Sequence, residues 1–147
     1  MVVFKERCSL SMALLVTAML LLDESGRFLL AQRQKPPSLA GMWEFPGGKM
    51  RPRESPEVCL TREIWEELGC EVDVVGIHDA NFHVYDDTGE VLILCYRCRL
   101  LSGSPRGMEG QGCRWFHPSE IPGLDIAPAD VPIVLRLLAS ARGLAVE

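Results

Sequence analysis

The sequence predicts an α/β fold in which a mixed β-sheet lies between helices. Two strand-like runs come first, followed by a helical segment, two long strand-like runs, a short strand and a closing helix. Strands and helices in this order are typical of α/β or α+β domains. The 147 residues suffice for one domain with its own core, but not for two of ordinary size. We therefore expect residues 1–147 to form a single domain.

Turn residues and apolar runs place the first elements. Residues 11–22 and 27–33 are rich in aliphatic side chains, and the turn ESGR between them predicts a hairpin. The stretch QKPPSLAGMWEFPGGKMRPRE is interrupted by Pro and Gly, so we expect a loop with a short extended piece at WEF.

The second half of the chain continues with longer elements. Residues 56–68 predict a helix, and residues 71–85 and 90–101 predict strands joined by the turn DDTG. The Gly-rich stretch SGSPRGMEGQG predicts a polar loop, CRWFH a short strand, and PADVPIVLRLLASARG the closing helix.

Charge and composition exclude some classes of function. The net charge is −5, and there is no long run of Lys or Arg. Long nucleic acids require a cationic face, so we expect no such partner. A small anionic substrate remains compatible with this charge, because a bound metal ion can reverse the local sign.

The cysteines and the N-terminal residues indicate where in the cell the protein is expected. Of the six cysteines, Cys95 and Cys98 form a CxxC, but on a strand these two side chains point to opposite faces and cannot chelate together. The apolar run SLSMALLVTAMLLL after a basic start could be a signal peptide. It is too short to span a membrane as a helix, and no cleavage site is convincing. We favour a buried strand, reduced thiols and a cytoplasmic protein without a membrane partner.

The predicted helix has clear ends and two faces. Ser55 suits the N-cap, Pro56 the first turn and Gly69 the C-terminus. At 100° per residue, one side is expected to face the core and the opposite side to carry acids. The core side comprises Val58, Thr61, Ile64, Trp65 and Leu68, and the acidic side comprises Glu63, Glu66 and Glu67.

The three crowded carboxylates indicate a metal site. Glutamates three and four residues apart repel each other, and a merely solvated face leaves that repulsion in place. The helix has no Lys, and we expect Arg62 to project to the side. Carboxylate oxygens are ligands that Mg²⁺ or Mn²⁺ prefers, and either ion would relieve the repulsion.

The loop before the helix adds features of phosphate chemistry. The glycines of GGK, residues 47–49, allow the backbone to approach a ligand, and their carbonyls can bind a metal. Lys49 can face a phosphate, and Glu54 adds a carboxylate. Together with the helix, this set indicates metal-assisted cleavage of a phosphate ester or anhydride. The spacing differs from that of a Walker A loop.

These residues resemble the Nudix box. Gly48, five residues, Glu54, seven residues and then REIWEELGC from Arg62 to Cys70 follow its pattern, with Cys70 in an aliphatic position. The resemblance runs from about Leu14 to Leu138 and is strongest to the MutT-type and cytidine-triphosphate-hydrolysing branches. It implies an α/β/α sandwich with a mixed sheet. It also implies an enzyme that uses Mg²⁺ or Mn²⁺ to cleave nucleoside triphosphates into a monophosphate and pyrophosphate.

The resemblance implies a role for each residue of the box. Glu63, Glu66 and Glu67 match the metal-binding carboxylates, the Gly47 carbonyl matches a further ligand, and Glu109 in MEGQG matches a distant glutamate that reaches the metal. Arg62 matches the residue that orients the glutamates, and Glu54 an outer support. Metal-activated water is expected to attack the β-phosphorus, and either Glu63 or Glu109 is the general base.

The resemblance also implies a nucleobase pocket. Arg33, Glu44, Phe45, Pro46 and Gly47 match positions that line the nucleotide site. Asp130 stands where oxidised-guanine hydrolases carry Asn. As a carboxylate it would accept from a cytosine amino group or a guanine edge; protonated, it could also donate.

Nucleotide-pool cleaning of the 8-oxo-dGTP type is the favoured function, linked to DNA repair. The first alternative is a CTP or 5-methyl-dCTP pyrophosphohydrolase. Further alternatives are a hydrolase of another nucleoside diphosphate derivative and a non-catalytic nucleotide sensor. Asp130 is alternatively a simple N-cap of the last helix, and Glu109 a solvated loop acid. Core packing is the favoured role of Phe82 and Tyr85, ahead of stacking on the base. Trp43, Trp65 and Trp115 are expected in the core or the pocket wall.

Overall fold

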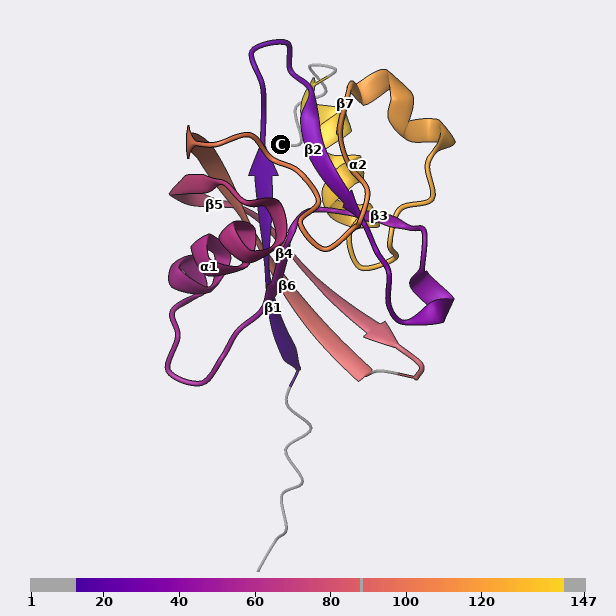
Figure 1. The fold of residues 1–147 in the computed structure, drawn as a ribbon. Coiled ribbons are helices and arrows are strands. Elements are labelled where there is room, and N and C mark those ends of the chain that lie inside the picture. Colours follow the sequence, from indigo (N-terminus) through magenta and orange to yellow (C-terminus); the bar gives the residue numbers. More distant parts are fainter. Residues whose placement is uncertain (1–12, 88, 142–147) are drawn as a thin grey trace, which may run out of the picture.

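A computed structural model describes residues 13–87 and 89–141, and their strands form two sheets (Figure 1). The larger sheet has the order β4 (Gly47–Lys49), β1 (Leu14–Leu21), β6 (Gly89–Ser102), β5 (Glu71–Tyr85). In it β1 is parallel to β6, and the other pairs are antiparallel. The smaller, antiparallel sheet has the order β3 (Trp43–Glu44), β2 (Phe28–Gln32), β7 (Cys113–Phe116).

Two α-helices and two short 3-10 helices complete the described chain. Helix α1 (Pro56–Leu68) and helix α2 (Val131–Ala141) lie on opposite sides of β1 (Figure 1). The 3-10 helices are η1 (Pro37–Leu39) and η2 (Pro118–Gly123). None of the helices in the described ranges is long and apolar enough to cross a membrane.

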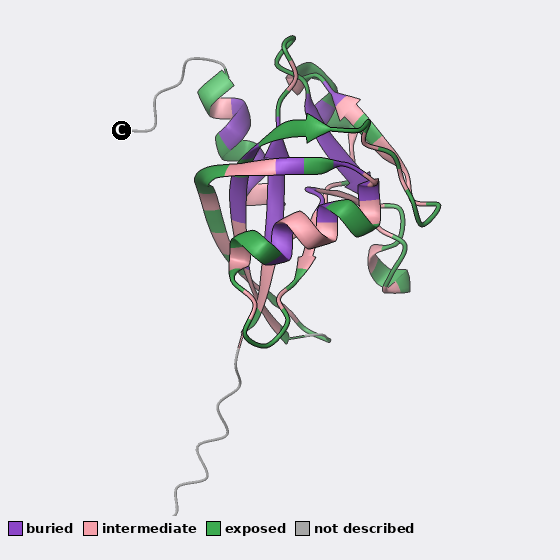
Figure 2. Cartoon of the chain, turned by 60° about the vertical axis from the view of Figure 1, so that its left-hand side comes forward, coloured by how far each residue is buried: buried purple, intermediate pink, exposed green. Residues whose placement is uncertain are grey.

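Alternate residues of the central strand build two separate cores. Met19 and Leu21 pack with α1, whereas Ala18 and Leu20 pack with α2. Successive strand residues point to opposite faces, so a strand covered on both sides is apolar throughout. The buried strands stand out in Figure 2 between exposed loops and helix surfaces. The predicted mixed α/β fold with helices on both sides is confirmed.

The predicted hairpin between the first two strands is wrong. β1 and β2 belong to different sheets, and an isolated bridge between Leu22 and Phe28 joins the residue after β1 to the first residue of β2. The turn itself forms, because the Asp23 carboxylate accepts hydrogen bonds from the backbone amides of Ser25 and Arg27, both at 2.9 Å. The strands then diverge, because both edges of β1 are occupied by β4 and β6.

Helix α1 has the predicted bounds, but the prediction of its core face is wrong. Ser55 accepts a hydrogen bond from the Val58 amide, and Gly69 ends the helix with φ 65°. Val58 and Trp65 are 57% and 58% exposed, whereas the expected core face contained both. The buried stripe of the helix is narrower than the predicted apolar arc. The buried residues are Cys59, Leu60, Ile64 and Leu68.

Other boundaries differ by smaller amounts. Gly47–Lys49, expected in a loop, forms β4 because it pairs with Val16, Thr17 and Ala18 of β1. The closing helix begins at Val131, and its expected last residues, 142–143, lie outside the described part, as do residues 11–12 of the first strand. Cys95 and Cys98 are free thiols in different cores, as their spacing on a strand predicts. Cys8 lies outside the described residues.

Candidate active site

A cavity of about 780 Å³ brings most of the predicted site residues together. Its walls come from β1, the 33–39 segment, β3, β4, α1, β5, β6 and the segment before α2. The predicted residues that line it are Arg33, Glu44, Phe45, Gly47, Lys49, Glu63, Glu67 and Asp130. The predicted residues outside its lining are Pro46, Glu54, Arg62, Glu66 and Glu109.

The acidic wall is a stripe of α1 packed on β4. Cys59, Glu63 and Glu67 are four residues apart, so they share one face of the helix, beside the buried stripe. A Cβ atom on Gly48 would collide with the Glu63 carboxyl group, and one on Gly47 with the Thr17 carbonyl. The two glycines are therefore required by the close packing of β4 against α1 and β1.

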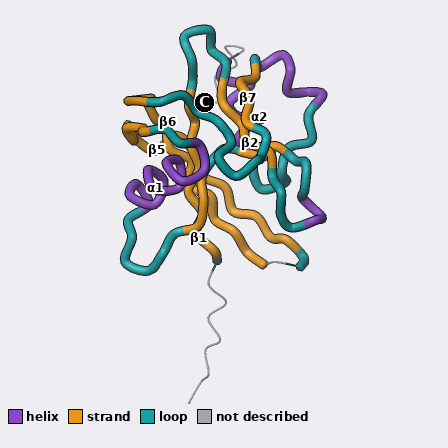
Figure 3. Tube along the Cα trace, in the orientation of Figure 1, coloured by secondary structure: helices purple, strands orange, loops and turns teal. Residues whose placement is uncertain are grey.

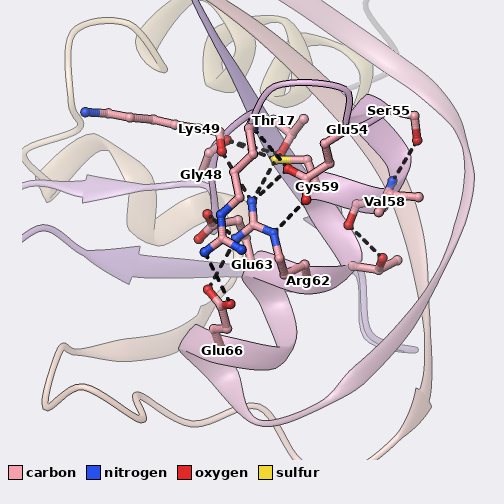
Figure 4. A network of polar contacts seen from close by, with 12 residues as sticks. Thr17, Gly48, Lys49, Glu54, Ser55, Val58, Cys59, Arg62, Glu63 and Glu66 are labelled. Carbon is pink, nitrogen blue, oxygen red and sulfur yellow. Dashed lines mark hydrogen bonds and ion pairs between the residues drawn. The ribbon is translucent and has the colours of Figure 1, made fainter.

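Arg62 lies at the centre of a carboxylate network (Figure 4). Its Nε and Nη2 atoms donate to the two oxygens of Glu54 at 2.7 and 2.8 Å. Its Nη1 donates to Glu63 at 2.8 Å and to Glu66 at 3.3 Å. The expectation that Arg62 projects to the side was wrong, because the guanidinium can neutralise these acids only by lying among them.

The Arg62 network affects the protonation of its partners. Hydrogen bonding from Arg62 lowers the pKa of Glu54 to about 2, against an opposing effect of burial. The same hydrogen bond with Glu54 raises the pKa of Arg62 far above its ordinary value. Both groups are therefore charged at every pH at which the protein is expected to work.

Glu67 has the opposite environment. Burial, followed by the charges of Glu63, Glu44 and Glu109, raises the pKa of Glu67 to about 8. The Gly47 backbone opposes this rise through a hydrogen bond. The metal-free protein therefore keeps Glu67 protonated below about pH 8, because its ionisation would add a negative charge beside these acids.

The oxygen atoms of this wall fit a hard divalent cation only in part. Glu63, Glu67 and the backbone of Gly47 line the same cavity and offer oxygen ligands. Glu66 stands apart, with a side chain that is 44% exposed and paired with Arg62 at 3.3 Å and Arg51 at 3.8 Å. Across the described ranges, no three Asp, Glu, His or Cys side chains are already gathered in a metal-binding arrangement. The donor chemistry fits, but the full set of expected ligands is not assembled.

The loop that carries Glu109 rests on the C-terminal end of α1. Met108 donates its amide to the Glu67 carbonyl at 2.8 Å, and Arg106 donates to the Leu68 carbonyl at 3.1 Å. The Gln111 side chain donates to the Glu67 carbonyl at 3.3 Å and accepts from the Glu109 amide at 2.9 Å. This loop, between β6 and β7 in Figure 3, thereby ties the backbones of Glu67 and Glu109 together.

A buried acid also lines the cavity. Asp130 is 4% exposed and accepts a hydrogen bond from the Phe45 amide at 3.1 Å. Burial, followed by the charge of Glu44, raises its pKa well above the ordinary value. Glu44 pairs with Arg33 at 2.9 Å, yet burial still raises the pKa of Glu44. The Asp130 carboxyl group thus points to the Phe45 amide.

The aromatic residues follow the prediction in part, because Tyr85, Trp43 and Trp115 pack against the core. Tyr85 lines the cavity, whereas Phe82 is 55% exposed on the other face of β5, so its expected core role is wrong. Trp43 packs edge-on against Phe116, and Trp115 packs against the α1 core. Trp65 is exposed, contrary to expectation.

Sequence reasoning missed two residues beside Gly48. Thr17 donates its hydroxyl to the Gly48 carbonyl at 3.3 Å, and Cys59 contacts the same carbonyl at 3.7 Å. A signal existed for both. In the sequence, Thr17 is a polar residue within an apolar run, and Cys59 precedes Glu63 by one helical turn. The structure buries Thr17 fully.

The acidic stripe, the glycines of β4 and the Arg62 network are the structural counterpart of the box pattern. The family model for the NUDIX domain matches residues 12–137. The chain belongs to the Nudix family. The prediction of a Nudix hydrolase is thereby confirmed.

Relatives from two branches of this Nudix family are similar over most of the chain. A protein named putative 8-oxo-dGTP diphosphatase 2 from Mycobacterium tuberculosis is 38% identical, over 81% of this chain and 84% of its own length. The CTP pyrophosphohydrolase of Escherichia coli is 36% identical, over 81% of this chain and 87% of its own length.

Solved structures agree with this Nudix assignment. The solution structure of the E. coli ORF135 protein has a TM-score of 0.78 at 30% identity, covering 92% of this chain and 95% of its own. The crystal structure of a MutT Nudix hydrolase from Burkholderia pseudomallei has a TM-score of 0.76 at 27% identity, covering 86% and 98%.

Proposed function

We propose that this Nudix protein is a metal-dependent pyrophosphohydrolase that cleaves 8-oxo-dGTP to a monophosphate and pyrophosphate. One observation carries the proposal: a single cavity joins an acidic wall at Glu63 and Glu67 to a buried polar group at Asp130. Its volume, about 780 Å³, lies in the range of small-ligand sites, about 300–1,000 Å³. One nucleotide could thus present its phosphates to the acidic wall and its base to Asp130.

The reaction adds water across the bond between the α and β phosphoryl groups. The water oxygen bonds to the β-phosphorus, the bond to the bridging oxygen breaks, and that oxygen leaves on the nucleoside monophosphate. A divalent cation held by Glu63, Glu67 and the Gly47 carbonyl would lower the pKa of the water and stabilise charge on the phosphates. Glu66 and Glu109 would join this set only by leaving their present positions.

The chain's own residues have separate tasks in this proposal. Arg62 holds Glu63 in place through the 2.8 Å hydrogen bond and is itself fixed by Glu54. Glu63 is the proposed general base, because it lines the cavity whereas Glu109 does not. Lys49 also lines the cavity and offers a cation to the phosphates.

Asp130 is the proposed reader of the nucleobase. One of its oxygens is occupied by the Phe45 amide, which leaves the other for the ligand. As a neutral acid, that oxygen would donate to an acceptor such as O6 of an oxidised guanine. The similarity to the diphosphatase from M. tuberculosis supports this choice of base.

CTP is the second candidate substrate. An ionised Asp130 would accept a hydrogen bond from the N4 amino group of cytosine. The 36% identity to the CTP pyrophosphohydrolase of E. coli supports this candidate. The two assignments therefore differ in the protonation of one carboxyl group and in the size of the base.

The deciding experiment compares kcat/KM for 8-oxo-dGTP and CTP with Mg²⁺ and with Mn²⁺, measured by pyrophosphate release. A preference of about a hundredfold, roughly 2.7 kcal/mol in the transition state, would identify the substrate. Reaction in ¹⁸O-labelled water should place the label in pyrophosphate. Label in the monophosphate, or full activity in a chelator, would refute the proposed mechanism.

A further inference from the structure

The peptide group on each side of Ala129 is held by a side chain of β5. The Asn81 side-chain amide donates to the Ala129 carbonyl at 2.9 Å. The Ala129 amide donates to the Tyr85 hydroxyl at 3.1 Å. Ala129 and the adjacent Asp130 are 3% and 4% exposed, so neither backbone group is held by bulk water. We call Asn81 and Tyr85 the β5 clamp.

The geometry of β5 explains how both side chains reach the same residue. Asn81 and Tyr85 are four residues apart on one strand, so they project from the same face. His83, between them, packs edge-on against the Tyr85 ring with centroids 4.4 Å apart, which restricts the tilt of that ring. The clamp is therefore part of the sheet and not of a loop.

A second contact joins β5 to the helix that follows the clamped segment. Arg136 of α2 pairs with Asp79 at 2.7 Å and donates to the Ala80 carbonyl at 3.1 Å. The segment before α2 is thus fixed at Ala129 and again through the helix. Removing one clamp hydrogen bond should shift the segment locally while α2 stays in place.

The clamped segment is a wall of the substrate cavity. Ala129, Asp130 and Tyr85 all line it, and the Asp130 carboxyl group reaches across to the Phe45 amide. A displacement of Ala129 would move Asp130 directly, because the two share a peptide bond. An unpaired amide or carbonyl at this buried position would cost free energy and favour such a displacement.

We propose that Asn81 and Tyr85 are positioning residues for nucleobase selectivity, acting through Ala129 on Asp130. The inference rests on the proposed function, in which Asp130 reads the base. The acidic wall at Glu63 and Glu67 belongs to α1, whereas the clamped segment precedes α2. Loss of the clamp should therefore weaken base discrimination and leave metal binding unchanged.

The test uses Tyr85→Phe, which removes one oxygen atom, and Asn81→Ser, which replaces the carboxamide by a shorter hydroxyl group. Phe82→Leu is the matched control, because Phe82 lies on the same strand but is 55% exposed and outside the cavity lining. The first readout is hydrogen exchange of the Ala129 amide by NMR. It should accelerate at least about tenfold in Tyr85→Phe and stay unchanged in Phe82→Leu.

The second readout is the ratio of kcat/KM values for the preferred nucleotide and its competitor. In both clamp variants the ratio should fall about tenfold through KM, with unchanged kcat and unchanged Mn²⁺ affinity. An unchanged ratio, or an equal loss on all substrates with a lower Tm, would reduce the clamp to ordinary structural support and overturn the inference.

Failure of the proposed function would be visible separately. Wild-type protein that hydrolyses neither nucleotide refutes the proposed activity before any variant is made. Selectivity is then judged from the relative affinities of 8-oxo-dGMP and CMP, measured by NMR titration. Equal relative affinities in wild type and Tyr85→Phe would still overturn the role of the clamp.

Discussion

The guanidinium of Arg62 and the carboxylate of Glu54 form a two-point ion pair, with N–O distances of 2.7 and 2.8 Å. Both side chains are largely shielded, with 18% and 10% of their surfaces exposed. The same guanidinium holds Glu63, so Glu54 acts on the cavity through Arg62. A substitution of Glu54 should therefore change activity although Glu54 does not line the cavity.

Glu54→Gln is expected to reduce activity without unfolding the protein. The amide cannot accept both guanidinium hydrogen bonds as a carboxylate does, so Arg62 loses its fixed orientation. The expected loss of kcat/KM or of Mn²⁺ affinity is about 10–100-fold, as for other residues that support metal ligands. Asp73→Asn is the control, because Asp73 pairs with Arg99 on the open surface, at 45% and 70% exposure. Equal effects of the two substitutions would contradict the positioning role.

Glu67→Gln and Glu66→Gln test metal-dependent catalysis. If both residues supply oxygens to the cation during the reaction, each substitution should lower kcat by more than about 100-fold, roughly 2.7 kcal/mol. Glu57→Gln, an exposed residue in the first turn of the same helix, should retain activity. Turnover by Glu66→Gln at the wild-type rate would exclude the metal role of Glu66, which in this structure faces Arg62 and Arg51.

The limits of helix α1 could be predicted from sequence, because its caps are local signals. Ser55, Pro56 and Gly69 act within one turn of the helix end. Which apolar residues face the sheet could not be predicted, because that depends on how far the sheet extends beneath the helix. Ile64 is fully buried and Trp65 is 58% exposed, although both lie on the apolar side of the wheel.

The pairing of the strands and of the charged side chains also could not be predicted from the sequence. The turn at Asp23 could be predicted from the sequence. Whether β2 pairs with β1 could not, because it depends on β4 and β6, which occupy both edges of β1. The carboxylates of the box could be predicted from the sequence. The placement of Arg62 among them could not, because it depends on the loop that brings Glu54 back to the helix. Asn81 and Tyr85 were missed as a pair because their partner, Ala129, is 48 and 44 residues away.

Ile64→Ala and Trp65→Ala should separate the true core face of α1 from the expected one. Ile64→Ala removes fully buried methyl groups, so we expect a loss of about 2–5 kcal/mol in unfolding free energy. Trp65→Ala should cost less than about 1 kcal/mol, since exposed positions contribute little. Urea denaturation of the two variants measures both values. A larger loss for Trp65→Ala than for Ile64→Ala would contradict the packing described for α1.

The metal-free protein should lose stability as the pH rises from about 4.5 to about 8. In the folded state Glu67 keeps its proton up to a pKa of about 8, whereas the unfolded chain releases it near the ordinary value of 4.5. Between these values the folded state binds more protons, so unfolding free energy falls with increasing pH. Glu54, with a pKa lowered from 4.5 to about 2, makes the unfolding free energy depend on pH only below pH 4.5, and so outside this window.

Urea denaturation in a chelator at pH 5.5, 7 and 8.5 measures this slope, with Glu67→Gln as the comparison. The variant should have a shallower slope, and the part that remains should carry the same sign, because burial also raises the pKa values of Asp130 and Glu44. Mg²⁺ should stabilise the wild type more at pH 8.5 than at pH 5.5, since a metal ligand must first lose its proton. Equal slopes for the wild type and Glu67→Gln would show that Glu67 is ionised in the folded protein throughout this range.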